Sequence, residues 1–325
     1  MEMMRERLEN NQIIIYFAVV VMAAATAWLL PWTSELETAI NPALALMLFV
    51  TFLQMPVTEL SQAAIRVRFL IPLLLTNFVA VPLLVAILIQ FLPTDPILIP
   101  GVLLVLLTPC IDYVVTFSQF GQADSRLLLA STPILLIMQI LLLPIYLRFF
   151  LSSHAVDLVR PGPFLHAFMW LIAAPLCLAA LTQFWAGRSQ SGKQVSDRLK
   201  FLPVPATALV LFIVVTAMVP QLGKAAAGHI LPMYTAFAVT APFVGWAVAR
   251  LFQLDTPSGR AVAFSAATLN SLVVLPLALA VPGTVPVLPA VIVTQTMVEL
   301  VSELIYIRLI PKLGQNSKRT TQEKM

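Results

Sequence analysis

The chain has 325 residues, of which 60% are hydrophobic and 10% are charged, and its formal net charge is +4. A soluble domain is about 45–50% apolar and about 25% charged, and a fold of this size cannot hide the surplus apolar side chains from water. The composition therefore excludes a soluble enzyme, a disordered chain and a nucleic-acid-binding protein. It predicts a multi-pass membrane protein that lies in the lipid bilayer.

Ten apolar segments along the chain have the length that a membrane crossing requires. A helix needs about 20 apolar residues to cross the hydrocarbon core. The ten runs between charged or Pro/Gly-rich breaks are 13–31, 39–58, 69–92, 97–120, 127–150, 164–186, 201–220, 229–252, 260–281 and 286–310. We therefore expect an all-α polytopic membrane protein with ten transmembrane helices.

Lys and Arg residues gather on one side of the predicted membrane. With the N-terminus inside, 16 of the 19 Lys and Arg residues fall in inner segments, and only Arg148, Arg160 and Lys224 fall in outer ones. Cytoplasmic loops carry an excess of these residues. The distribution predicts a plasma-membrane protein (the inner membrane in a bacterium) with both termini in the cytoplasm.

The last two predicted spans of each half match at an offset of 160 residues. Residues 108–110 align with residues 268–270, and the Ile-Tyr-x-Arg run at 145–148 aligns with the same run at 305–308. Because five spans per half is an odd number, the second half enters the membrane from the opposite side. This arrangement is common among secondary transporters.

We therefore expect two inverted five-helix repeats, residues 1–155 and 156–325. The fourth and ninth spans carry polar residues at the same register, and a proline in the fourth removes a backbone donor. Helices broken in this way surround the solute site of many secondary transporters. We expect broken helices four and nine to cross near the midplane and bind a small solute. The residues predicted to contact the solute are Thr108, Pro109, Cys110, Thr268, Asn270 and Ser271.

Carboxyl and amide side chains inside the spans predict a site for a coupling ion. A charge at the bilayer centre costs at least about 2.5–3.5 kcal/mol. Asp112 either caps a half-helix or couples an ion, and both readings stay open. Glu299 lies deep in the last span, where a buried carboxylate takes up a proton. Gln139 is its counterpart in the first half, Gln295 lies one turn before it, and Glu303, one turn after it, receives no assigned role.

The sequence allows two interpretations of Cys110. A cysteine in an apolar span is commonly a small buried hydrophobe, and Cys177 is an example of that reading. Cys110 differs because it lies at the interruption, where a sulfur atom is a soft ligand for a thiophilic solute. The chain has no HExxH, GxSxG, P-loop or CxxC motif, so we expect no enzyme activity, metal site or cofactor, and no pattern fixes an oligomeric state.

Several of these segments resemble one transporter family. Asn41-Pro42, Pro109-Cys110 and the 295–299 segment resemble the bile-acid/sodium symporter superfamily and, more narrowly, its arsenical-resistance (arsenite permease) branch. The resemblance implies a panel domain of spans 1, 2, 6 and 7 that rocks against a core domain of spans 3, 4, 5, 8, 9 and 10. In that branch a cysteine matching Cys110 is needed for arsenite export.

The residues after Pro109 depart from the sodium-coupled members, which carry Gly-Gly followed by Ser-Asn, whereas this chain continues with Cys-Ile-Asp-Tyr. Our first hypothesis is proton-coupled efflux of arsenite, in which Cys110 contacts the solute and Glu299 exchanges the proton. The alternative is a sodium-coupled symporter of a small organic anion. Sodium would then bind oxygen atoms of Asp112, Asn270 and Gln295.

Overall fold

The computed structural model describes residues 2–29, 36–54, 67–93, 98–111, 113–150, 169–218, 224–279 and 287–314. Within these ranges the chain forms helices and no β-strand. Four described helices are long and apolar enough to cross a membrane: Val67–Phe91, Ser125–Phe150, Gly228–Leu251 and Ala290–Lys312. A fifth is reached if the bent pair Gln190–Leu199 and Pro203–Ala217 is one span. The protein is therefore a helical membrane protein, and the count of ten spans stays a prediction.

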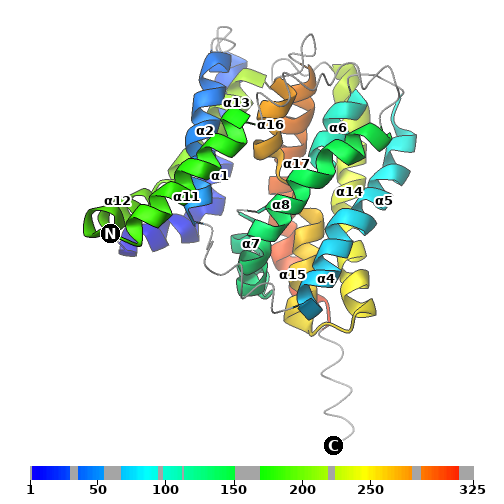
Figure 1. The fold of residues 1–325 in the computed structure, drawn as a ribbon. Coiled ribbons are helices and arrows are strands. Elements are labelled where there is room, and N and C mark those ends of the chain that lie inside the picture. Colours follow the sequence, from blue (N-terminus) through cyan, green and yellow to red (C-terminus); the bar gives the residue numbers. More distant parts are fainter. Residues whose placement is uncertain are drawn as a thin grey trace, which may run out of the picture.

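The helices form two groups, which Figure 1 shows side by side. The first group contains α1 (Glu2–Leu29), α2 (Glu37–Gln54), α11 (Ala174–Ala186) with the preceding π-helix η5 (Met169–Ala173), α12 (Gln190–Leu199) and α13 (Pro203–Met218). In it, α13 packs on both α1 and α2, and α11 packs on α2.

The second group contains the remaining helices. They are α4 (Val67–Leu75), η3 (Thr76–Ala80), α5 (Val81–Leu88), η4 (Ile89–Phe91), α6 (Leu98–Leu106), α7 (Val114–Phe120), α8 (Ser125–Phe150), α14 (Lys224–Leu251), α15 (Thr256–Ala267), α16 (Ser271–Leu279), α17 (Val287–Leu309) and η7 (Ile310–Lys312). In this group α17 packs against α6, α14 and α16. The two groups meet where α13 contacts α17 and α2 contacts α16.

Many large apolar side chains point away from both groups. Leu83, Leu141 and Val239, on three different helices of the second group, are each about 60% exposed, at 62%, 60% and 59%. On a soluble protein such patches would be aggregation sites. In a bilayer these side chains face the acyl chains of the lipids instead of water. Their exposure therefore agrees with the apolar composition of a membrane protein.

Two prolines inside long helices leave carbonyl groups without their usual donor, and a tyrosine hydroxyl reaches each one. Pro82 has no N–H for the carbonyl of Phe78, four residues earlier, and the Tyr146 hydroxyl donates to that oxygen at 2.5 Å. The Tyr306 hydroxyl likewise donates to the carbonyl of Ala238, four residues before Pro242. The two sets of residues are 160 positions apart.

The short helix α12 lies between predicted spans, and the sequence analysis did not predict it. It begins after Ser189, whose hydroxyl oxygen accepts a hydrogen bond from the Gly192 N–H at 3.4 Å. Serine is a favoured residue at this position because its oxygen satisfies one of the unpaired donors of the first turn. The helix carries Lys193, Asp197 and Arg198, as a segment outside the hydrocarbon core can.

Candidate functional site

The two interrupted segments meet and pair with each other. The Cys110 N–H donates to the Thr268 carbonyl at 2.9 Å, and the Asn270 N–H donates to the Thr108 carbonyl at 2.8 Å. Pro109 and Leu269 form an antiparallel bridge between these bonds. Backbone groups freed by a broken helix need partners in a membrane, and here each interruption supplies partners for the other. The two bonds are equivalent in the repeat, because both the donors, Cys110 and Asn270, and the acceptors, Thr108 and Thr268, are 160 positions apart.

The residues of both segments are buried. Thr108, Cys110 and Thr268 are 0% exposed, and Asn270 is 3% exposed. The interruptions separate α6 from α7 and α15 from α16, so four half-helices end at the pairing. The predicted meeting of the two polar segments is thus a feature of the structure.

Glu299 binds directly to this pairing from α17. Its Oε1 accepts a hydrogen bond from the Tyr113 hydroxyl at 2.6 Å, and its Oε2 accepts one from the Leu269 N–H at 2.9 Å. The amide Nε2 of Gln295, one turn earlier, also donates to Oε2. A carboxylate accepts but does not donate when it is ionised. Glu299 therefore lies among donors on both oxygens although it is only 2% exposed.

Glu303 lies one turn further along α17 and is 0% exposed. Its Oε1 is 2.5 Å from the hydroxyl oxygen of Thr268. Its Oε2 has no hydrogen-bond partner among the described residues. We assigned Glu303 no role from the sequence. Its position four residues after Glu299 can be read from the sequence, but its hydrogen bond to Thr268 of the second interruption cannot.

The other predicted residues are distributed around the same core. The Ser271 hydroxyl oxygen accepts from the Thr296 hydroxyl at 2.9 Å, whereas the Thr108 hydroxyl lies near carbonyls of its own helix, those of Leu104 and Val105, at 3.1 and 2.9 Å. Three buried amide atoms of these predicted residues have no hydrogen-bond partner within the described ranges. They are Gln139 Oε1, Asn270 Nδ2 and Gln295 Oε1. Asp112 lies outside the described residues.

A cavity of about 260 Å³ lies between the two helix groups. Its walls come from α1, α2 and α13 of the first group and from α7, α8, Ile111 and Tyr113 of the second. Its polar and aromatic side chains are Gln12, Tyr16, Thr51, Gln54, Tyr113, Thr116, Gln119 and Thr207. The described residues that line it carry no ionised group. One hydrogen-bond donor among them, Gln12 Nε2, has no partner within the described part of the chain.

Tyr113 connects the cavity to the pairing, because it lines the cavity and also donates to Glu299. Ile111 lines the cavity too, but Cys110, its neighbour, is not among the described lining residues. Sequence reasoning missed Tyr113. The sequence shows a polar aromatic residue three positions after Cys110. It does not show the contact with Glu299, because the two residues are 186 positions apart.

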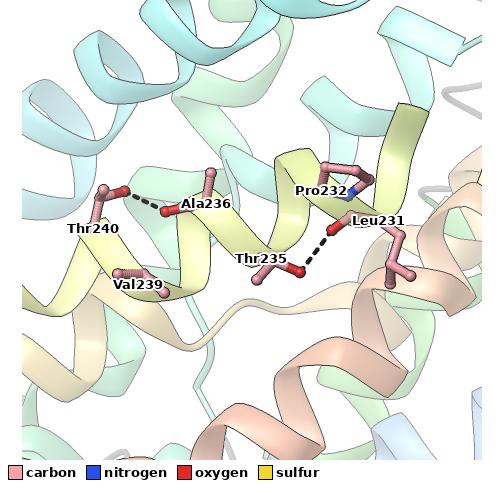
Figure 2. A pocket seen from close by; sticks show the side chains of 6 residues that line it. All are labelled: Leu231, Pro232, Thr235, Ala236, Val239 and Thr240. Carbon is pink, nitrogen blue, oxygen red and sulfur yellow. Dashed lines mark hydrogen bonds between the residues drawn. The ribbon is translucent and has the colours of Figure 1, made fainter. Parts of the chain in front are cut away.

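A second hollow lies on the outer surface of α14 and is a poor site for a solute. Figure 2 shows that the hydroxyls of Thr235 and Thr240 bond back to the carbonyls of Leu231 and Ala236, at 2.8 and 2.7 Å. All six lining residues lie on this one helix. The hollow therefore neither encloses a solute nor directs these hydroxyls toward one.

Interrupted membrane helices beside buried carboxyl groups are typical of secondary transporters. The model of the sodium bile acid symporter family matches residues 41–226, more than half of the chain, and the chain belongs to this family. No curated protein matches the chain. The protein is therefore a multi-pass membrane transporter whose substrate is a small solute. The matched region includes the first interruption and ends before the second.

Proposed function

We propose that this transporter exports arsenite from the cytoplasm in exchange for protons. The observation that carries the proposal is the cavity, whose described lining residues carry no charge and include Tyr113, the hydrogen-bond donor to Glu299. Arsenite is largely neutral near pH 7 and binds sulfur. A cavity with amide, hydroxyl and phenol groups suits such a solute better than it suits an organic anion, which basic side chains attract.

The proposed architecture has ten spans in two inverted repeats. Spans four and nine are α6 with α7 and α15 with α16, and the 160-residue offset of both the backbone pairing and the tyrosine–carbonyl bonds supports the repeat. The first helix group is the proposed panel domain and the second is the proposed core domain. Rocking of one group against the other would change which side the cavity opens to.

The cavity opens to the cytoplasm in this proposal. Gln12 lies near the beginning of α1, Gln54 ends α2, Gln119 is near the end of α7 and Pro203 begins α13. With both termini inside, as the Lys and Arg distribution predicts, all four positions are at the inner side. The conformation is then inward-facing, ready to receive a cytoplasmic solute.

Cys110 supplies the proposed sulfur contact, and Thr108, Asn270 and Ser271 supply polar contacts. Ile111 lines the cavity while Cys110 is buried behind it. Contact between solute and sulfur therefore requires the 111–113 segment to move. Glu299 is the proposed site of proton exchange, because Tyr113 connects it to the cavity.

A sodium-coupled symporter of a small organic anion is the second candidate. Membership of the sodium bile acid symporter family favours it, and Gln295 Oε1 is a buried oxygen without a partner among the described residues, as a sodium ligand would be before the ion binds. The described lining residues of the cavity include no basic side chain, which counts against the organic anion.

The test is arsenite tolerance in a host that lacks its own exporters. We expect the native chain to protect the host and Cys110→Ser to abolish protection. Cys177→Ser is the matched control, because Cys177 is exposed on α11 and far from the pairing in sequence. Full protection by Cys110→Ser would remove the sulfur from the mechanism, and no protection by the native chain would refute arsenite as the substrate.

A further inference from the structure

We infer that Glu299 and Glu303 form a two-carboxyl unit that holds one proton in this conformation, on Glu303, while Glu299 is ionised. Glu303 keeps this proton through the transport cycle and acts as a hydrogen-bond donor that positions Thr268. This inference deepens the proposed function and rests on it only for the assignment of Glu299 as the group that exchanges protons.

The hydrogen count at Thr268 places the proton on Glu303. The Thr268 hydroxyl oxygen is 2.7 Å from the Phe264 carbonyl and 2.5 Å from Glu303 Oε1. A hydroxyl has one proton to donate, and a carbonyl has none. Both distances are too short for two oxygens without a proton between them. Thr268 therefore donates to Phe264 and accepts from Glu303, which must be the neutral acid.

The contacts of Glu299 favour its ionised form, because donors face both of its oxygens. Its oxygens accept from the Leu269 N–H and the Gln295 amide, neither of which can accept in return. The Tyr113 hydroxyl is 2.6 Å from Glu299 and 3.2 Å from the Leu269 carbonyl, so its one proton goes to the nearer carboxyl oxygen. Three donors stabilise the ionised form of a carboxyl group.

The groups around the pair leave this assignment undisturbed. The described residues of α6, α7, α13 and α16 include no titratable side chain. On α14 the Tyr234 hydroxyl donates to the Val291 carbonyl, and on α17 the Tyr306 hydroxyl donates to the Ala238 carbonyl. On α15 the guanidinium of Arg260 donates to the carbonyls of Gln122, Pro311 and Leu313. Two adjacent carboxylates would repel each other, and a proton on one relieves the repulsion.

Access separates the roles of the two acids. Glu299 bonds to Tyr113, which lines the cavity, whereas Glu303 is 0% exposed and is not among the described lining residues. Protons from the cavity therefore reach Glu299 first. Glu303 acts through Thr268, whose carbonyl accepts the Cys110 N–H in the pairing. Glu303 is thus a positioning residue.

The transport test compares Glu303→Gln with Glu303→Ala and Glu299→Gln in proteoliposomes. Glutamine has the shape of the neutral acid and donates to Thr268, so we expect Glu303→Gln to retain proton-driven flux within about twofold and Glu303→Ala to lose at least about tenfold. If Glu303→Gln is as inactive as Glu299→Gln at equal membrane abundance, Glu303 exchanges the proton and the inference fails.

A second measurement needs no transported solute. It therefore tests the assignment of the proton to Glu303 separately from the proposed arsenite transport. Infrared difference spectra of the purified protein detect the carbonyl stretch of a buried protonated carboxyl group by its shift in D₂O. We expect this band in the wild type and in Glu299→Gln and its loss in Glu303→Gln. A band that disappears in Glu299→Gln and stays in Glu303→Gln would overturn the assignment even if arsenite transport is confirmed.

Discussion

The interruption at residues 108–110 and the interruption at residues 268–270 share their backbone geometry but not their side-chain partners. Each donates one N–H to the other at 2.8 or 2.9 Å. The Thr108 hydroxyl lies near carbonyls of its own helix, whereas the equivalent Thr268 hydroxyl also bonds to Glu303 of α17. The backbone pairing is symmetric, whereas the hydrogen bonds of Glu299 and Glu303 to residues 268 and 269 are made with the second interruption.

The helices behind the two interruptions differ in the same way. Gln139 of α8 is 160 positions before Glu299 of α17, and its Oε1 has no partner among the described residues. Glu299 instead accepts hydrogen bonds from Tyr113, Leu269 and Gln295. The two interruptions therefore share a backbone crossing, whereas the carboxyl group that we propose for proton exchange lies in the second half.

The largest expected effect comes from making the two halves alike at this position. Glu299→Gln removes the group proposed to exchange protons, so proton-driven flux of solute should be lost in vesicles. The matched control is Gln139→Asn, which keeps a neutral amide and should retain most of the flux. Equal loss in both variants, at equal abundance in the membrane, would contradict a special role for the second half.

Tyr113→Phe sharpens the comparison with a smaller effect. The substitution removes one of three donors to Glu299, and a hydrogen bond to a charged group contributes about 1.5–3 kcal/mol. The ionised form of Glu299 loses stabilisation, so the protonated form persists to higher pH. We expect the pH profile of flux to shift to higher pH by about one unit. An unchanged profile would mean that Tyr113 does not stabilise the charge.

The two tyrosines that satisfy proline-freed carbonyls should give the smallest effect. Tyr306 is 6% exposed and Tyr146 is only half-buried, so Tyr306→Phe should destabilise the protein more. A buried acceptor left without its donor costs about 1–3 kcal/mol, and an interhelical bond in a membrane averages about 0.6 kcal/mol. Thermal unfolding in detergent measures both variants.

Restoring the missing donor provides the control for this prediction. Pro242→Ala returns an N–H to the Ala238 carbonyl, so Tyr306→Phe should cost less in that background than in the wild type. Equal costs in the two backgrounds would show that the hydroxyl does not act through the proline-freed carbonyl.

Local sequence patterns were sufficient to predict the helical membrane fold and the meeting of residues 108–110 with residues 268–270. Apolar runs report membrane burial directly, and polar residues at the same register in both halves predicted the two interruptions. The bonds of Tyr113 to Glu299 and of Glu303 to Thr268 join positions 186 and 35 residues apart. No local pattern encodes such contacts, because they depend on how the half-helices pack.

Flux in sealed proteoliposomes under separately imposed proton and sodium gradients tests the central claim most directly. The account predicts that a proton gradient drives arsenite flux, that a sodium gradient of equal size does not, and that Cys110→Ser abolishes the flux while Cys177→Ser retains it. Flux of an organic anion that follows the sodium gradient and ignores the proton gradient would contradict the account.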